Sequence, residues 1–257
     1  MQQISHKIAL SVGLALSSLS ALAEENITAP AGALSGTFSV VSQYIFRGAV
    51  ENDDVALQAG IEYAPTSAIT LGYWGSTLDY DPSDSSADKD HGFEHDFYLS
   101  YARPLSSNWS YKIQTTAYYY QDGGTVHAEE GDQRHTTAFD LLGELAYKDL
   151  TFSATVMLGD ASFANAGDLY LSTAYQYALP QNFTLNSSIG VSVFNDRHDD
   201  AIIETRDNVV LSEARIGLAK PIANTPAEVT FDYIWGGKDR MAERFDDHLV
   251  LGINFNF

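Results

Sequence analysis

A period of two in the hydrophobic residues constrains this chain most strongly, because it repeats through twelve segments of roughly ten residues each. In residues 55–63, for example, Val, Leu, Ala, Ile and Tyr occupy the odd positions, and Ala, Gln, Gly and Glu occupy the even ones. About ten residues is the length that a tilted β-strand needs to cross the hydrocarbon core of a bilayer. The pattern therefore predicts membrane-crossing strands with one apolar and one polar face.

The connections between the segments alternate between short and long. The short ones look like tight turns, whereas most of the long ones are acidic, and the six long ones together hold 20 of the 34 Asp and Glu residues and 7 basic residues. We therefore predict an all-β fold, a transmembrane antiparallel β-barrel of twelve strands with both termini on one side. The predicted strands cover residues 38–46, 55–63, 69–73, 97–101, 109–119, 139–147, 150–158, 169–177, 183–193, 210–218, 229–235 and 249–257.

Aromatic residues on the apolar face cluster near the ends of the predicted strands. This distribution is typical of the two aromatic girdles of a membrane barrel, and Tyr44 and Phe46 are expected in the outer one. The chain ends in Phe257 with Ile253 and Phe255 on the same face. That ending resembles the sorting signal of outer-membrane barrels, which places the protein in the bacterial outer membrane, in contact with its lipid.

The first 23 residues have the features of a secretory signal peptide. Lys7 precedes an uncharged, mostly apolar run that ends in Ala21-Leu22-Ala23. We expect residues 1–23 to be the signal peptide and residues 24–257 the barrel. The exported part would carry 13 Lys and Arg residues against 34 Asp and Glu, which makes nucleic acid an unlikely partner, and the chain has no cysteine.

Four short motifs, in order and spacing, carry a resemblance to a known family. Residues 42–48, Ser-Gln-Tyr-Ile-Phe-Arg-Gly, resemble the S-x-Y-x-x-R-G opening strand of the TorF-like (Gcw_chp) family of outer-membrane proteins, which are described as porins. The second strand at 58–63, the G-x-W-x-S element at 72–76 and the E-x-D element at 94–96 follow. The resemblance implies a barrel with a porin label and no defined substrate.

Nine charged residues are expected to face inward from the strands and to line the pore. Six are acidic and three are basic, so a lumen lined in this way would be net negative and would favour cations. Passive passage of small cationic or polar solutes is therefore the predicted function. The nine residues are Arg47, Glu62, Asp96, Lys112, Asp140, Glu144, Glu213, Arg215 and Asp232. If the turn near residue 223 is tight, Arg215 lies opposite Asp232, and Arg47 lies near the outer mouth.

Other functions remain open at this point. The acidic loop 79–90 has carboxylates that could bind a divalent cation, although it lacks the pattern of an EF-hand. An outer-membrane enzyme, a protease or a lipid hydrolase, could use Asp79 with Asp81, or Asp196 with His198, at the outer mouth. The loops could also serve a structural or adhesive role. The sequence assigns no catalytic, cofactor-binding or metal-binding residue.

Overall fold

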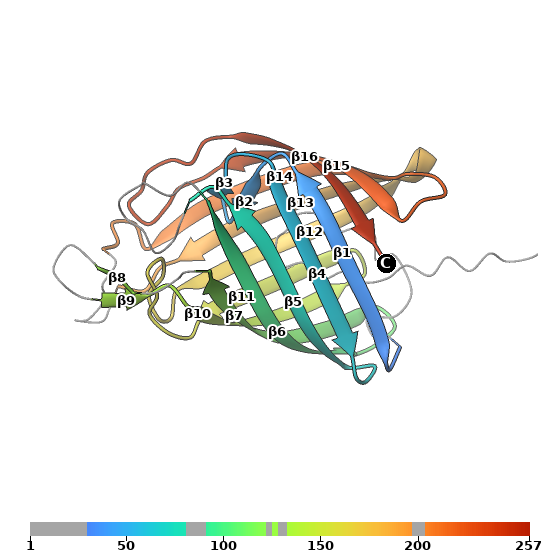
Figure 1. The fold of residues 1–257 in the computed structure, drawn as a ribbon, viewed down its shortest axis with the longest axis horizontal. Helices are drawn as coiled ribbons and strands as arrows, with labels where there is room; N and C mark the ends of the chain where they lie inside the picture. Colours follow the sequence, from blue (N-terminus) through green and yellow to red (C-terminus); the bar gives the residue numbers. More distant parts are fainter. Residues whose placement is uncertain (1–29, 81–90, 122–124, 128–132, 197–203) are drawn as a thin grey trace, which may run out of the picture.

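Twelve antiparallel strands close into a barrel in the computed structural model, which describes residues 30–80, 91–121, 125–127, 133–196 and 204–257 (Figure 1). The predicted fold class and strand number are thus confirmed. Among the described residues, no helix is long and apolar enough to cross a membrane. The barrel strands are β1 (Ala33–Val41), β4 (Ala56–Ala64), β5 (Ile69–Leu78), β6 (Gly92–Pro104), β7 (Trp109–Tyr120), β10 (Ala138–Tyr147), β11 (Leu150–Met157), β12 (Leu169–Leu179), β13 (Phe183–Val193), β14 (Val209–Pro221), β15 (Ala227–Gly236) and β16 (His248–Asn256).

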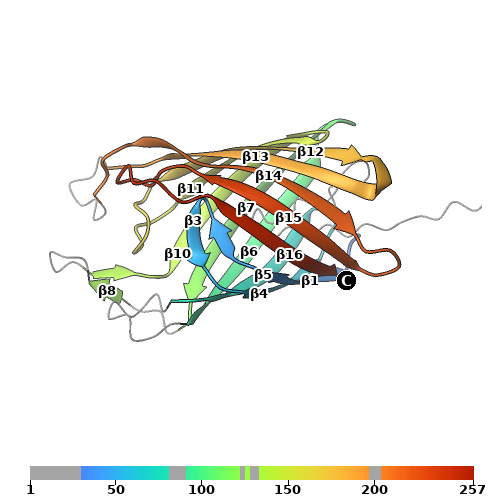
Figure 2. The same cartoon turned by 90° about the horizontal axis from the view of Figure 1, so that it is seen from above.

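Two small hairpins are not part of the barrel sheet. One consists of β2 (Tyr44–Phe46) and β3 (Ala49–Asn52), and the other of β8 (Thr125–His127) and β9 (Gln133–His135). A single turn of 3-10 helix, η1 (Pro180–Asn182), connects β12 to β13. Each barrel strand is hydrogen-bonded to its neighbour in the chain, and β1 closes the ring with β16. The strands run obliquely to the long axis (Figure 2), as closure of a barrel requires.

The short turns all lie at one end of the barrel, which we call the turn end, because antiparallel strands reverse there. β1 begins and β16 ends at this end, where Ala33 pairs with Ala64 and Thr37 with Asn256. The six longer connections lie at the opposite end, called the loop end. The alternating connection lengths predicted tight turns at 148–149 and 179–181; the structure has its turns at 148–149, between β10 and β11, and at 180–182, between β12 and β13.

Alternate side chains face outward and inward, as the period of two predicts. On β10, Phe139 is 50% exposed and Leu141 is 40% exposed, whereas Asp140, which lies between them in the chain, is fully buried. The outward face forms an apolar band that includes Leu71, Phe97, Leu99, Ile113, Phe152, Leu171, Ile189, Leu218, Phe231 and Leu251. In water such a band would be a large apolar patch, so its exposure fits a barrel surrounded by lipid.

Replacing Leu141 with Arg is expected to destabilise the barrel by about 2 to 4 kcal/mol in a bilayer, because a charge near the middle of the hydrocarbon core is costly. Leu142→Arg, one residue along on the inward face, should cost less. Unfolding in urea of both variants in lipid vesicles measures the difference. Equal destabilisation at the two positions would contradict the facing of β10.

The first predicted strand is wrong in part. Residues 38–46 were expected to form one membrane strand with Tyr44 and Phe46 on the lipid face, but β1 ends at Val41 and pairs with β4 and β16. The chain then turns inward as β2, where Tyr44 is only 4% exposed. The alternation simply continues through Ser42 and Gln43, so the period of two does not reveal that the segment leaves the wall.

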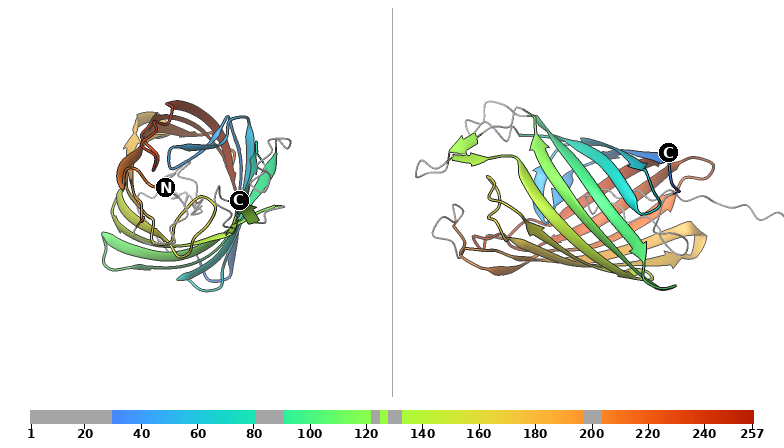
Figure 3. Two further views of the ribbon diagram at one scale, coloured as in Figure 1. Left: turned by 90° about the vertical axis from the view of Figure 1, so that its left-hand side faces the viewer. Right: turned by 90° about the horizontal axis from the view of Figure 1, so that it is seen from below.

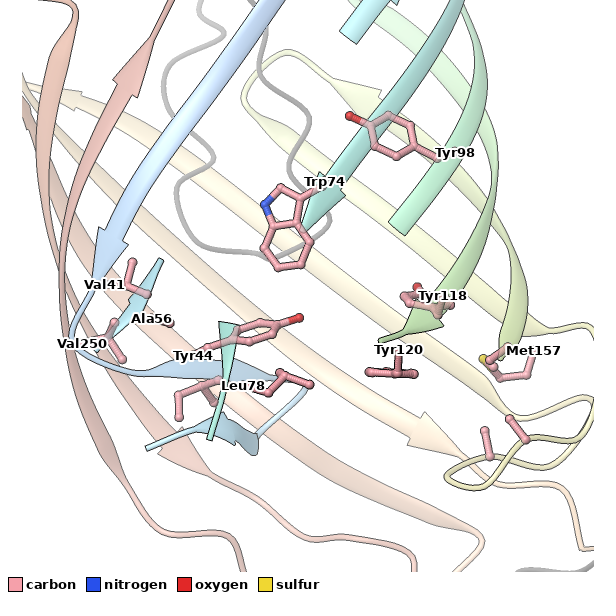
Figure 4. Close-up of a cluster of buried hydrophobic side chains, with 14 of the residues drawn as sticks. Val41, Tyr44, Ala56, Trp74, Leu78, Tyr98, Tyr118, Tyr120, Met157 and Val250 are labelled. Carbon is pink, nitrogen blue, oxygen red and sulfur yellow. The ribbon is translucent and has the colours of Figure 1, made fainter. Parts of the chain in front are cut away.

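The interior differs between its two ends. Near the turn end, inward side chains are small or polar, and pairs such as Ser153 with Ser172, and Gln176 with Asn186, are hydrogen-bonded across neighbouring strands. Toward the loop end, a cluster of buried side chains lies in the interior, and Figure 4 shows most of these side chains. The cluster contains Val41, Tyr44, Ile45, Ala56, Trp74, Leu78, Tyr98, Tyr118, Tyr120, Ala138, Met157, Ala161, Ala164, Ile234 and Val250.

Candidate functional site: an inward hairpin and a charged lumen

The motif Tyr-Ile-Phe-Arg-Gly forms the inward hairpin, residues 44–52, rather than an opening strand. Phe46 pairs with Ala49, so Arg47 and Gly48 are the two central residues of the turn. Both have positive φ, 52° and 90°, as the central residues of a type I′ turn do. A Cβ on Gly48 would also collide with the backbone oxygen of Ser212, which explains the glycine. A left-handed arginine is strained, and such strain concentrates at functional sites.

The side chain of Arg47 extends from the tip of the hairpin across the lumen. Its Nη2 lies 3.8 Å from Oδ2 of Asp140 on β10, and its guanidinium carbon lies 4.6 Å from the ring centre of Tyr170 on β12. Around the ring, β11 is six places from β1 in either direction, and β10 and β12 flank it. The hairpin that leaves β1 therefore reaches the opposite wall, and the end-on view in Figure 3 shows it inside the ring.

Four of the inward carboxylates accept hydrogen bonds from tyrosine hydroxyls. The hydroxyl of Tyr98 donates to Glu62 at 2.6 Å and that of Tyr118 to Asp140 at 2.7 Å. Further donations run from Tyr120 to Glu94 at 3.3 Å and from Tyr170 to Glu213 at 3.1 Å. A tyrosine hydroxyl stabilises a carboxylate without cancelling its charge. These four acids are thus hydrogen-bonded without gaining a counter-charge from the tyrosines.

Two further ion pairs, beside that of Arg47 with Asp140, join predicted inward charges. Lys112 Nζ lies 3.2 Å from Oε2 of Glu144, its register partner across β7 and β10. Arg215 Nη2 lies 3.4 Å from Oε2 of Glu213 on the same strand. Asp232, which is 6% exposed, completes the predicted set. All nine residues predicted to line the pore thus have inward or buried positions on the barrel strands or, for Arg47, on the hairpin.

The predicted pairing of Arg215 with Asp232 is wrong by two residues. Arg215 lies opposite Ile234, and Asp232 lies opposite Gly217, although the two charges still interact electrostatically along a diagonal. The reason is the turn between β14 and β15. It centres one position later than expected, where the N–H of Ile222 donates to the carbonyl of Ala227 and Asn224 adopts a left-handed conformation.

Three further inward acids were not predicted. Glu94 and Glu228 are 4% and 7% exposed, and Glu51 lies on the inward hairpin. The alternation already contains a signal for the first two, because Glu94 is two residues from Asp96 and Glu228 is four residues from Asp232 on the same faces. Burial raises the pKa of Glu51 to about 7, although the hydroxyl of Tyr80, 2.6 Å away, opposes the shift.

The loop end is held together around Asp168. This carboxylate accepts hydrogen bonds from the backbone N–H groups of Asn165 and Asn195, and from the guanidinium of Arg240, which also stacks on Phe194. Three connections, those between β11 and β12, β13 and β14, and β15 and β16, therefore meet at one buried acid. These contacts fix the loops against the barrel mouth beside the hairpin.

The described residues contain no group of three His, Cys, Asp or Glu side chains that could hold a metal ion. Most of the acidic loop 79–90 lies outside the described residues, as do Asp81 and His198 of the two pairs considered for an enzyme. On the outward face, the hydroxyl of Tyr73 lies 2.9 Å from Nδ1 of His95. The rings of Tyr73 and His95 pack against those of Phe93, Phe97 and Tyr119. Such a group of outward-facing rings is typical of the aromatic girdle at a membrane interface.

Residues 25–247 match the model of a family described as "Bacterial protein of unknown function (Gcw_chp)". The chain belongs to the Gcw_chp family. The resemblance drawn from the four sequence motifs is thereby confirmed. The Arg-Gly turn of the inward hairpin, Trp74 and Asp96 occupy three of those motifs, so the residues that point to the Gcw_chp family lie at or beside the crossing of the lumen. A search of curated proteins found no relative.

Solved structures with a similar fold are outer-membrane proteins. An outer-membrane channel from Pseudomonas putida F1 superposes with a TM-score of 0.52 at 10% identity, over 92% of this chain and 99% of that chain. LpxR from Salmonella typhimurium has a TM-score of 0.46 at 9% identity, over 87% and 99%. OprD from Pseudomonas aeruginosa has a TM-score of 0.41 at 12% identity, over 88% and 65%. At these identities the likeness concerns the fold alone.

Proposed function

We propose that this Gcw_chp protein is a porin-like channel of the bacterial outer membrane that passes small polar or cationic solutes by diffusion. The observation that carries the proposal is a closed twelve-strand barrel whose lumen is crossed by one charged hairpin. A structural barrel has no need of a left-handed arginine held across its interior. The channel of Pseudomonas putida, which has this fold, adds support. The loop end would face outward, and residues 1–23 would be removed on export.

Cation preference follows from the balance of charge along the lumen. The structure adds Glu94, Glu228 and Glu51 to the six predicted acids, while the bases remain Arg47, Lys112 and Arg215. Fields inside a low-dielectric wall enrich ions of the opposite sign. At physiological salt the Debye length is about 8 Å, so charges in the outer loops act weakly and those in the lumen act strongly.

Purified protein in a planar lipid bilayer is expected to show stepwise conductance with a reversal potential that indicates cations. Neutralising Asp140 and Glu144 together, as Asn and Gln, should weaken this preference, because Arg47 and Lys112 then lose the acids beside them. Neutralising Asp84 and Asp88 in the loop, an equal change in charge, should have a smaller effect. Absence of conductance would overturn the channel, and anion selectivity would overturn the charge mechanism.

A further inference from the structure

A group of buried acids lies on the inner wall beside the inward hairpin. Glu94, Asp96 and Asp140 are 4%, 1% and 0% exposed. Asp96 interacts electrostatically with both Glu94 and Asp140. Glu51 of the hairpin interacts with Glu94, so the group continues from the wall onto the hairpin. Four carboxyl groups from three elements thus form a chain of electrostatically interacting pairs beside the hairpin.

Three oxygen atoms of this group have no hydrogen-bond partner among the described residues. They are Oε2 of Glu94, Oδ1 of Asp96 and Oδ1 of Asp140, and all three are buried. No Lys, Arg or His of the described residues forms a salt bridge with Glu94 or Asp96. A buried carboxylate without a counter-charge is strongly disfavoured. Without a cation such a carboxyl group takes up a proton, so Glu94 and Asp96 are placed to ionise against a cation that reaches them.

Arg47 shows which kind of cation this region accepts. Its guanidinium lies 4.7 Å from the ring centre of Phe46, 4.6 Å from that of Tyr170, and within ion-pair distance of Asp140. The interior thus already holds one planar organic cation, the guanidinium of Arg47, between aromatic rings and a carboxylate. This single base compensates Asp140 and leaves Glu94 and Asp96 for a second cation.

Aromatic rings surround the two remaining acids. Trp74 on β5 and Tyr118 on β7 are the register partners of Asp96 on either side, and Tyr120 is the partner of Glu94. Tyr44 of the hairpin packs edge-on against Trp74 at 5.6 Å, and Figure 4 shows these rings in the interior. Aromatic faces attract organic cations. The lack of a three-residue metal-ligand group among the described residues disfavours a coordinated metal ion here.

We propose that Glu94 and Asp96, with the rings of Tyr44, Trp74, Tyr118 and Tyr120, form a binding site for organic cations that carry a guanidinium or ammonium group. Such a site would lie on the path of the solute and would define the solute class of the channel. In this respect it rests on the proposed function. The carboxylates neutralise the charge of the cation, and the rings contact its apolar faces. An inorganic cation of equal charge has no planar or methyl surface to pack against the rings.

Isothermal titration of methylguanidinium into the full-length protein in detergent micelles tests the site without any need for conductance. Methylguanidinium should bind, and neutral N-methylurea, which has nearly the same shape, should not. Asp96→Asn and Glu94→Gln should each lower the affinity for methylguanidinium about tenfold or more, because each removes a charge-assisted contact. The matched control is Glu228→Gln, which removes another buried inward acid at the turn end and should leave the affinity unchanged.

Binding of N-methylurea as tightly as methylguanidinium, or undiminished binding in both folded acid variants, would overturn the site. If potassium at equal concentration displaced methylguanidinium, the binding would be a general counter-ion effect. That result would also overturn the proposed solute class. Circular dichroism shows whether each variant is folded, and the comparison of the two ligands on the wild-type protein needs no variant. Conductance without methylguanidinium binding refutes the site alone, whereas binding without conductance refutes the channel alone.

Discussion

Replacing residues 42–55 with Asn-Gly is expected to raise the single-channel conductance at least about twofold, because the element that crosses the lumen is removed. Val41 and Ala56 are already paired across β1 and β4, so a two-residue type I′ turn can join them without changing the barrel register. The wild-type current is expected to be limited at the hairpin, where Arg47 joins the hairpin to Asp140 on the opposite wall.

A smaller change gives an independent test of the same prediction. Gly48→Ala should push the hairpin away from the wall, since the new Cβ meets the backbone of Ser212 and the φ of 90° disfavours alanine. Its conductance should rise or fluctuate between levels. Gly143→Ala is the matched control, because nothing lies within 4 Å of the added Cβ there. An unchanged conductance after removal of the whole hairpin would contradict its role as the constriction.

Deleting Phe257 is expected to reduce the folded, membrane-inserted protein at least about threefold, because the closing seam is the shortest in the barrel and loses its last contacts. The register of β1 with β16 has five residue pairs, whereas that of β12 with β13 has eleven. Phe257 extends the seam by two hydrogen bonds to Gly36. Its N–H donates to the carbonyl of Gly36, and its carbonyl accepts a hydrogen bond from the N–H of Gly36. Its ring also covers Gly36, where an added Cβ would collide with the ring.

The measurement is the heat-sensitive mobility of the protein in outer-membrane fractions, which separates folded from unfolded barrels. Phe231→Ala removes an aromatic side chain of the same size from the outward face of β15, away from the seam, and serves as the control. We expect it to cost some stability but to leave membrane levels near those of the wild type. Normal levels of the truncated chain would refute a role for the terminal phenylalanine in closure or sorting.

The wall of the barrel could be predicted from the sequence because each strand has one face in contact with lipid. That contact imposes a strict alternation, and the short turns between Tyr147 and Leu150 or between Leu179 and Phe183 mark the reversals. Inward charges followed from the same alternation. Glu94 and Glu228 follow the same alternation, but they lie just before the predicted strands 97–101 and 229–235 and were not included among the inward charges.

The site itself could not be predicted, for three physical reasons. The Arg-Gly turn lacks the usual Asn-Gly signal of a two-residue hairpin, so Tyr44 was assigned to the lipid face. The register of β14 with β15 depends on the conformation of Asn224, which shifts the partners of Arg215 by two positions. The tyrosine–carboxylate pairs join residues as distant as Tyr170 and Glu213, and only the closed ring brings them together.

The hairpin has a consequence for the order of assembly. Its tip contacts Asp140, Tyr170 and the backbone of Ser212, which belong to β10, β12 and β14 and come roughly 90 to 165 residues later in the chain. Those strands face the tip only after the sheet has curved on itself. Docking of Arg47 must therefore follow curling of the wall, so the last step of folding sets the width of the path, and an incompletely closed barrel would be a leaky one.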